Sequence, residues 1–267
     1  MVALYLSQST KEARTPGTVA VALAGISWVH RLAQLPEPAH NFLCSSVVNS
    51  ARRSLPTNKG RKDVLEQWQV LKILQFHASD SLMDLRLSAL ITTMFLGFLR
   101  VSEALSLTMA DISFDNHTVT LQLLQSKTDQ FRNGQQVPIT QSENQCCAFR
   151  ALRRYVKSGQ LCAQPLTAPL FQSIIHSKGQ WRLSGSPMSY NSVRQSLRTA
   201  LTNIGLNPDR FGTHSLRAGG ATAAAIAGVP DELIQLQGRW RTQSSMTRYV
   251  QRPQDKRLAV SQALGLG

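Results

Sequence analysis

The chain has 267 residues, a formal net charge of +14 and a hydrophobic content of 42%. This length and hydrophobic share suffice for one large domain or two small ones with a buried core, and they exclude an intrinsically disordered chain. The excess of Lys and Arg favours a polyanionic partner, foremost nucleic acid. The alternatives are an acidic membrane surface and a basic surface that only faces solvent.

The cysteines and the longest apolar stretch exclude further classes. Cys44, Cys146, Cys147 and Cys162 contain no C-x-x-C pair, so they predict neither a zinc framework nor a disulfide scaffold, and a reducing compartment fits them best. Residues 87–99 are too few to span a bilayer and predict a buried helix. No secretion signal is visible. We therefore expect no metal site, no membrane partner and an intracellular location.

Residues 1–56 predict a small helical N-terminal domain. Apolar residues recur at helical spacing in 17–35, and a second helix is predicted for 39–53. The stretch 54–63 then combines Pro, Asn and Gly with Lys59, Arg61 and Lys62. This composition predicts a basic linker, residues 57–63, although an ordinary basic loop has the same composition.

Residues 64–267 predict a second domain that is mostly helical. Alternating apolar residues in "TVTLQL" and "QQVPI" flank Asn133-Gly134, so residues 111–140 predict a small antiparallel sheet. Residues 159–189 are rich in Pro, Ser and Gly and predict irregular structure. The fold class is therefore mainly α (α+β). Helices are predicted at 64–78, 81–99, 143–158 and 189–206, followed by short helices.

The stretch "GTHSLRAGGATAAA" places His214 and Arg217 one helical turn apart at the start of a helix. Alone this pair is a weak signal, because a histidine at a helix start is often only a cap or a core residue. The glycines and alanines that follow have very small side chains, so the helix there is narrow. We expect another element to pack closely on it and to fix both side chains against the core.

Four further residues accompany this pair in a definite order. They are Arg100 in "LGFLRVSEAL", Lys127 in "LLQSKTDQFRNGQQVPI", Trp240 in "GRW" and Tyr249 in "TRY". Together with "THSLRAGGAT" these elements resemble the tyrosine recombinase or phage integrase family, the lambda-integrase-like enzymes that exchange DNA strands. The resemblance spans residues 90–250. Residues 17–56 look like the end of that family's helical core-binding domain.

The resemblance implies a mechanism that needs no metal, ATP or other cofactor. Tyr249 would attack a DNA phosphodiester to give a 3′-phosphotyrosyl enzyme and a free 5′-hydroxyl. Arg100 and Arg217 would bind the non-bridging oxygens, where charge gathers in the transition state. Lys127 would protonate the leaving oxygen. His214 would support the phosphate and help to take the tyrosyl proton.

Two further residues have roles by the same resemblance. Trp240 stands where many members carry His; its indole N–H can donate to a phosphate but cannot accept a proton. Glu103, one helical turn after Arg100, matches an acidic residue that holds a guanidinium in place.

Each of these residues also has an ordinary interpretation. Arg100 could merely pair with Glu103, Lys127 could be solvated in its hairpin, and Trp240 could be core. The rivals outside the set are Arg132 for Lys127, and Tyr5, Tyr155 and Tyr190 for Tyr249.

The family's partner is double-stranded DNA, which two domains would clamp with Lys59, Arg61 and Lys62 against the backbone. Its protomers exchange a C-terminal segment, here 252–267, so a dimer to tetramer on DNA is expected. The resemblance thus predicts a site-specific recombinase or integrase of a mobile element, located with the DNA (in the nucleus of a eukaryote, or in the cytoplasm or nucleoid of a prokaryote). The alternatives are a recombinase-derived DNA-binding protein that no longer exchanges strands, and a relaxing topoisomerase.

Overall fold

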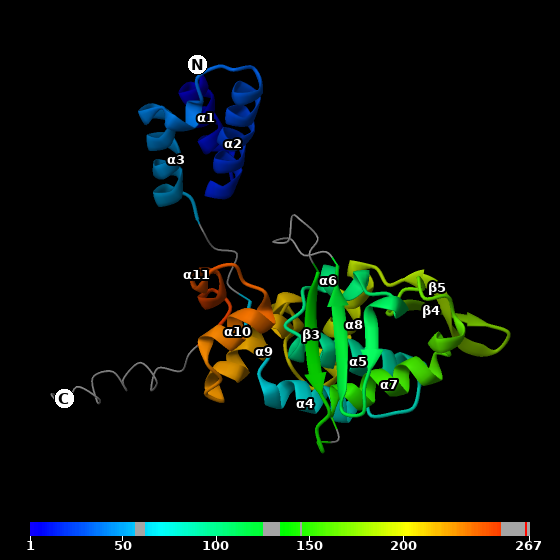
Figure 1. Cartoon of the computed structure of the whole chain (residues 1–267). Helices are drawn as coiled ribbons and strands as arrows, with labels where there is room; N and C mark the ends of the chain where they lie inside the picture. The colour runs from blue at the N-terminus through cyan, green and yellow to red at the C-terminus, as the bar shows by residue number, and fades with distance from the viewer. Residues whose placement is uncertain (57–61, 125–133, 145, 252–264, 266–267) are drawn as a thin grey trace. The chain divides into compact units, whose positions relative to one another are not determined.

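The computed structural model describes residues 1–56, 62–124, 134–144, 146–251 and 265. The chain divides into two compact units, Met1–Arg61 and Lys62–Gly267 (Figure 1). The division falls within the segment 57–63 that composition marks as a linker. The DNA-binding role of the first unit remains a prediction.

The first unit consists of three α-helices, α1 (Val2–Glu12), α2 (Pro16–Leu32) and α3 (Phe42–Ser54). Pro16 starts α2, where a missing N–H costs nothing. Asn41 caps α3 by accepting hydrogen bonds from the next turn. Sequence analysis missed α1 because Leu6 is its one buried residue, which leaves no apolar period. The core of this unit consists of Leu6, Val19, Leu23, Cys44, Val48 and Ala51.

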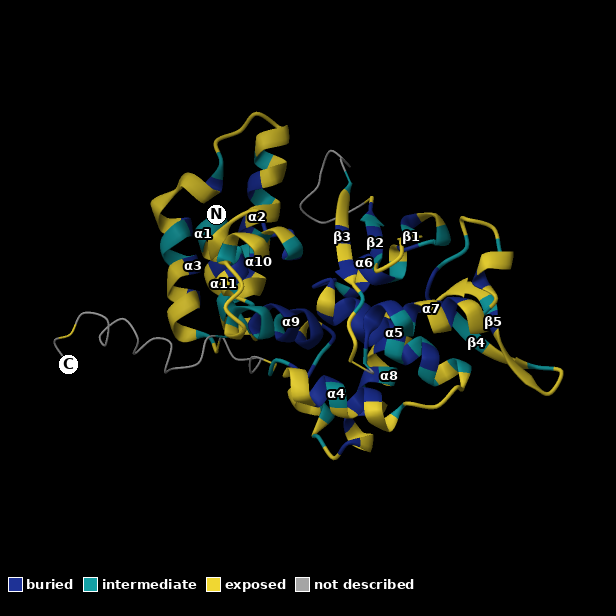
Figure 2. Ribbon diagram, turned by 60° about the horizontal axis from the view of Figure 1, so that its bottom comes forward, coloured by how far each residue is buried: buried dark blue, intermediate teal, exposed yellow. Residues whose placement is uncertain are grey.

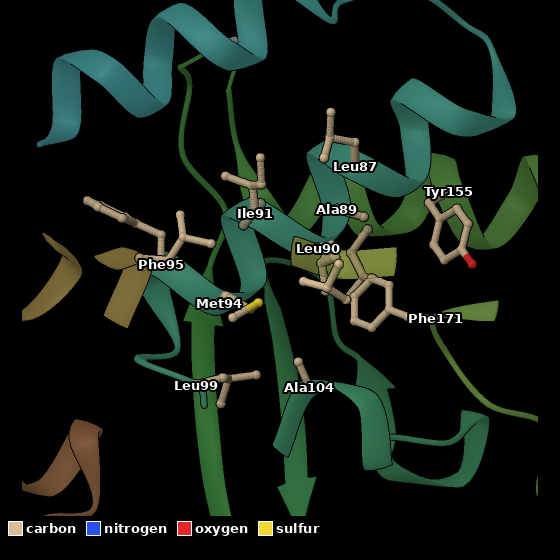
Figure 3. Packing of buried hydrophobic residues seen from close by; sticks show 14 of the residues in the cluster. Leu87, Ala89, Leu90, Ile91, Met94, Phe95, Leu99, Ala104, Tyr155 and Phe171 are labelled. Atoms are coloured by element: carbon tan, nitrogen blue, oxygen red, sulfur yellow. The ribbon is translucent and has the colours of Figure 1, made fainter. Parts of the chain in front are cut away.

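The second unit is built around α5 (Leu82–Leu96), which is buried over most of its length (Figure 2). Ser81 caps its start by accepting from the N–H of Asp84 at 3.2 Å. Apolar side chains on several sides of α5 meet the surrounding elements, and Figure 3 shows Leu90 beside Phe171. The predicted apolar helix 81–99 is thus confirmed as a core helix, and it ends three residues earlier than predicted.

The predicted antiparallel sheet is present as β1 (Ile112–Phe114), β2 (Thr118–Leu123) and β3 (Gln135–Thr140), in that order. Val119 pairs with Ile139 and Leu121 with Val137, and all four side chains are buried. One face of the sheet therefore covers the core, as the period of two in the sequence requires.

The prediction of irregular structure for 159–189 is wrong in part. Strands β4 (Gln172–Ser177) and β5 (Gln180–Pro187) form a second antiparallel hairpin. It turns through Lys178 and Gly179, which both have positive φ angles. Most of β5 is exposed, so the apolar alternation that reveals a half-buried strand is missing.

The remaining helices complete the second unit and include the predicted short C-terminal ones. The α-helices are α4 (Gln67–Phe76), α6 (Val101–Ser106), α7 (Ala148–Ser158), α8 (Tyr190–Asn203), α9 (His214–Ile226), α10 (Asp231–Gly238) and α11 (Gln243–Thr247). The short 3₁₀ turns of the second unit are η2 (Met109–Asp111), η3 (Leu161–Ala163) and η4 (Pro208–Arg210), whereas η1 (Pro38–His40) belongs to the first unit. Within the described ranges, no helix is long and apolar enough to cross a bilayer.

The close approach predicted for the Gly and Ala run is confirmed at two glycines of α9. A Cβ on Gly219 would lie 1.8 Å from the carbonyl oxygen of Leu65. A Cβ on Gly220 would lie 2.0 Å from the carbonyl oxygen of Phe95. Any larger residue would push α9 away from its neighbours, so these glycines fix the depth at which Arg217 sits.

Candidate active site

Glu103 on α6 is the centre of a cluster of three arginines. Its carboxylate forms ion pairs with Arg100, with Arg239 at 2.9 Å and with Arg217 at 3.5 Å. Only 3% of the residue is exposed. Burial by itself would raise the pKa of Glu103, but Arg239, Arg100 and Arg217 outweigh it, so the pKa is lowered. One carboxylate facing three guanidiniums leaves an excess of positive charge at this point.

Arg100 is placed by the end of α5 and the start of α6. It is the N-cap residue of α6, and its backbone N–H donates to Glu103 at 2.8 Å. Its side chain pairs with the same carboxylate and is 15% exposed. Arg100 is therefore the most accessible of the three guanidiniums. It does pair with Glu103, as the ordinary interpretation expects, and its catalytic role stays a prediction.

Arg217 projects from the first turn of α9 and is fully buried. Its Nη1 donates to the carbonyl oxygen of Phe98 and its Nη2 to that of Gly238, both at 2.5 Å. Its Nε is buried without a partner among the described residues. Burial first, and Arg100 next, lower the pKa of Arg217 to about 9. It stays cationic at neutral pH.

Two aromatic residues lie over Arg217, one just after α10 and one just after α11. The guanidinium carbon lies 4.5 Å from the ring centre of Trp240 and 5.4 Å from that of Tyr249. The two rings pack together with centroids 5.3 Å apart. Trp240 is buried, and its Nε1 has no hydrogen-bond acceptor among the described residues. Trp240 is thus both a core residue and a candidate hydrogen-bond donor.

Tyr249 follows α11 directly and is half-buried. Its backbone is held by Thr222 of α9. The Thr222 hydroxyl donates to the carbonyl oxygen of Tyr249 at 3.4 Å and accepts from the N–H of Gln251 at 3.0 Å. The tyrosine therefore lies against Arg217 of its own chain.

His214 is the first residue of α9 and is exposed at the surface. Partial burial of its ring, and then the charges of Arg217 and Arg100, lower its pKa below the ordinary 6.5. The imidazole is neutral at pH 7 and able to accept a proton.

Several predicted residues lie outside the described part of the chain. These are Lys127 and its rival Arg132, and Lys59 and Arg61 of the linker. Lys62 is described: it is exposed, and its ammonium group donates to the carbonyl oxygen of Asp209. This hydrogen bond ties the start of the second unit to η4.

The structure does not bring the rival tyrosines of the second unit to the cluster in the way that it brings Tyr249. Tyr155 is fully buried and stacks on Phe171 with ring centres 5.9 Å apart. Burial raises its pKa to about 12, so it is a core residue. Tyr190 is exposed at the start of α8, where its hydroxyl oxygen accepts from Thr213 at 3.5 Å.

Sequence analysis missed Arg239, although "GRW" contains it. The signal was its position directly before Trp240, but an arginine beside a tryptophan has no distinctive spacing. Thr222 and Phe98 were also missed, because the Thr222 hydroxyl and the Phe98 carbonyl bond to groups that are distant in the sequence, which no sequence pattern reveals. Within the described residues, no group of three or more His, Cys, Asp or Glu side chains could hold a metal ion.

The model of the phage integrase family matches residues 63–256, which cover most of the chain and every described member of the cluster. The chain belongs to the phage integrase family. Among curated phage integrase relatives, the integrase/recombinase xerD homolog of Selenomonas ruminantium is 27% identical over 252 residues, 92% of this chain and 71% of that protein.

Solved structures of the phage integrase type share the fold. The Tn1549 transposon integrase bound to transposon right end DNA matches with a TM-score of 0.65 and 16% identity, over 99% of this chain and 84% of that one. The XerH site-specific recombinase bound to its palindromic difH substrate matches with a TM-score of 0.58 and 19% identity. That match covers 80% of this chain, which spans 56% of the XerH chain. The predicted fold class and family are confirmed.

Proposed function

We propose that this chain recombines or integrates DNA at specific sites by cutting and rejoining strands through Tyr249. The observation that carries the proposal is a pair of adjacent buried N–H donors that have no acceptor among the described residues. They are Arg217 Nε and Trp240 Nε1, and the two residues pack on each other beside the positively charged cluster around Glu103. Buried donors normally find a partner, and a phosphate offers several acceptor oxygens.

The proposed reaction is a transesterification in two reversible steps. The Tyr249 oxygen attacks the phosphorus, a phosphotyrosyl bond forms at the 3′ side, and the bond to the 5′-oxygen breaks. The 5′-oxygen takes up one proton and the tyrosyl oxygen loses one. A tyrosyl oxygen, with an ordinary pKa of about 10, is a better leaving group than an alkoxide. A second 5′-hydroxyl can therefore reverse the step.

The cluster suggests a division of roles. Arg100, the accessible guanidinium, would meet the phosphate first, and Arg217 would complete the clamp through its unpaired Nε–H. Neutral His214 would help to take the tyrosyl proton. Lys127 would protonate the leaving oxygen, as the family resemblance implies.

We propose double-stranded DNA as the partner, bound in the compartment that holds it. The net charge of +14 supports phosphate binding. Lys59, Arg61 and Lys62 would lie against the backbone. Replacing all three by Ala should flatten the dependence of log Kd on log salt by about 0.9 for each phosphate that the variant no longer neutralises. An unchanged slope would contradict this role.

We further propose that two to four protomers assemble on DNA through the segment 252–267. The continuous described segment 146–251 ends at Gln251, which helps to line an apolar groove of about 670 Å³ between α4 and α9 together with Trp68, Leu71 and Ile226. Light scattering of the DNA complex tests this. A chain ending at Gln251 should bind DNA as a monomer, whereas unchanged assembly would contradict the proposal.

The experiment for the main proposal is covalent trapping on DNA. Duplex fragments from the region flanking the coding sequence are nicked so that cleavage releases a short strand and cannot reverse. The wild type should form a protein–DNA adduct that survives denaturation, and Tyr249→Phe should form none. DNA binding without an adduct would support the derived DNA-binding protein. Relaxation of supercoils without a defined site would support a topoisomerase.

A further inference from the structure

Helices α5 and α10 end in the same left-handed turn, with a residue other than glycine at the left-handed position. At the end of α5 the N–H of Leu99 donates to the carbonyl of Met94 at 3.0 Å, and at the end of α10 the N–H of Trp240 donates to the carbonyl of Gln235 at 3.1 Å. In both turns the residue before the donor has a left-handed backbone: Phe98 has φ 46° and Arg239 has φ 55°. Glycine is the preferred residue at this position of a helix end.

The two strained residues are joined by the Arg239 side chain. Its Nη1 donates to the carbonyl oxygens of Gly97 at 3.0 Å and Gln237 at 2.6 Å. Its Nη2 donates to the carbonyl oxygen of Phe98 at 3.0 Å and to Glu103 at 2.9 Å. The guanidinium thus caps the negative end of α5 and closes the end of its own helix.

This bonding decides what Arg239 can do. A guanidinium has two N–H groups on each η nitrogen, so four hydrogen bonds occupy all of them. The remaining Nε is buried without a partner among the described residues, as is the Nε of Arg217, and the side chain is 2% exposed. The η nitrogens of Arg239 therefore have no N–H left for a phosphate. Arg217, by contrast, makes three η hydrogen bonds among the described residues, one of them to the same Phe98 carbonyl, and so keeps one η N–H that is not used there.

We propose that Arg239 is a positioning residue, whose guanidinium ties the start of the Trp240–Tyr249 segment to the end of α5 and to Glu103. Resting on the proposed strand-cleavage function, this assigns to Arg239 the placement of Tyr249 against Arg217. Glycine at position 239 would relieve the backbone, but it would leave three carbonyl oxygens and one carboxylate without this donor. The left-handed backbone of Arg239 is tolerated because the hydrogen bonds of its side chain hold the turn in this conformation.

The test compares wild type, Arg239→Gly, Arg239→Lys and a control, Arg154→Gln, which removes an exposed ion pair between α7 and Asp80. Adduct formation on nicked DNA is followed under single-turnover conditions, with DNA affinity measured separately. Arg239→Gly should bind DNA as the wild type does and cleave about 100-fold more slowly, since misplacing a reacting group costs on this order. Arg239→Lys should stay slow, because an ammonium group cannot span these acceptors. Arg154→Gln should match the wild type.

Guanidinium rescue separates positioning from general damage. Guanidinium chloride at low millimolar concentration should speed Arg239→Gly, whereas NaCl at equal ionic strength should not. In free protein, hydrogen exchange in residues 240–251 should be faster in Arg239→Gly and slower again with guanidinium. Wild-type cleavage rates in Arg239→Gly, or a slowed variant that guanidinium does not help, would overturn the inference. If the wild type forms no adduct, the proposed function fails, and the exchange data alone then decide the role of Arg239.

Discussion

Glu103 Oε2 accepts a hydrogen bond from Arg239 Nη2 at 2.9 Å, deep in a site where that oxygen also lies 3.5 Å from Arg217. The carboxylate is therefore the common partner of guanidiniums that reach it from α6, α9 and the end of α10. Three separate elements converge on one negative charge, so the stability of the site and its chemistry depend on the same residue.

Replacing Glu103 by Gln should destabilise the second unit strongly. Removing one partner of a buried charge cluster costs about 3–5 kcal/mol, because the remaining charges stay buried and unpaired. Urea unfolding measures the change. The matched control is Asp80→Asn, an exposed pair with Arg154, which should cost less than about 1 kcal/mol. Equal effects of the two substitutions would contradict the account.

The same carboxylate predicts a pH dependence. The folded-state pKa of Glu103 lies below the ordinary 4.5, so the unfolded chain binds the proton first as pH falls. The contribution of ionised Glu103 to the free energy of unfolding is fully present above pH 4.5. It is lost as the pH falls through the folded-state pKa. The stability gap between wild type and Glu103→Gln should therefore be constant at neutral pH and shrink on acidification. A gap that is the same at low pH would contradict this.

His214 should titrate below 6.5 in the free protein, in part because Arg217 and Arg100 disfavour its cation. Arg100→Gln removes one of these charges and should raise the pKa. Nuclear magnetic resonance of the imidazole protons measures both values. Arg154→Gln, on α7, should leave the titration unchanged. A His214 pKa that Arg100→Gln does not move would show that the guanidinium does not act on the imidazole.

Thr222→Val should slow strand cleavage without weakening DNA binding. The substitution keeps the shape but removes the hydroxyl that holds Tyr249 and Gln251, and a buried hydrogen bond of this kind contributes about 1 kcal/mol. We expect a rate lower by about tenfold in single-turnover cleavage. Thr202→Val serves as the control, because its exposed hydroxyl donates to the carbonyl oxygen of Arg198 within α8. Equal rates for the two variants would exclude a role for Thr222.

Alanine at Gly219 or Gly220 should destabilise the second unit by about 3 kcal/mol, the upper range for overpacking. The added methyl group would meet the backbone of Leu65 or Phe95 at about 2 Å. Gly25→Ala on α2 has open space around it and should stabilise the first unit by up to about 1 kcal/mol. Thermal unfolding of each variant measures these changes, and a tolerated Gly219→Ala would mean that α9 can move.

The fold and much of the site were predictable because they depend on local patterns. Apolar spacing revealed α5, and alternation revealed β2 and β3, whereas exposed β5 lacked any such period. The order of Arg100, His214, Arg217, Trp240 and Tyr249 pointed to one site, and the described chain brings these residues together. Arg239 was not predictable, since its role comes from a left-handed turn and from carbonyl oxygens of α5 that are distant in sequence.

The most direct test of the central claim is mass spectrometry of the trapped protein–DNA adduct after digestion of both components. We predict a nucleotide joined by its 3′-phosphate to the peptide that contains Tyr249, and no such species from Tyr249→Phe. A nucleotide attached to any other residue, or an adduct that Tyr249→Phe still forms, would contradict the account.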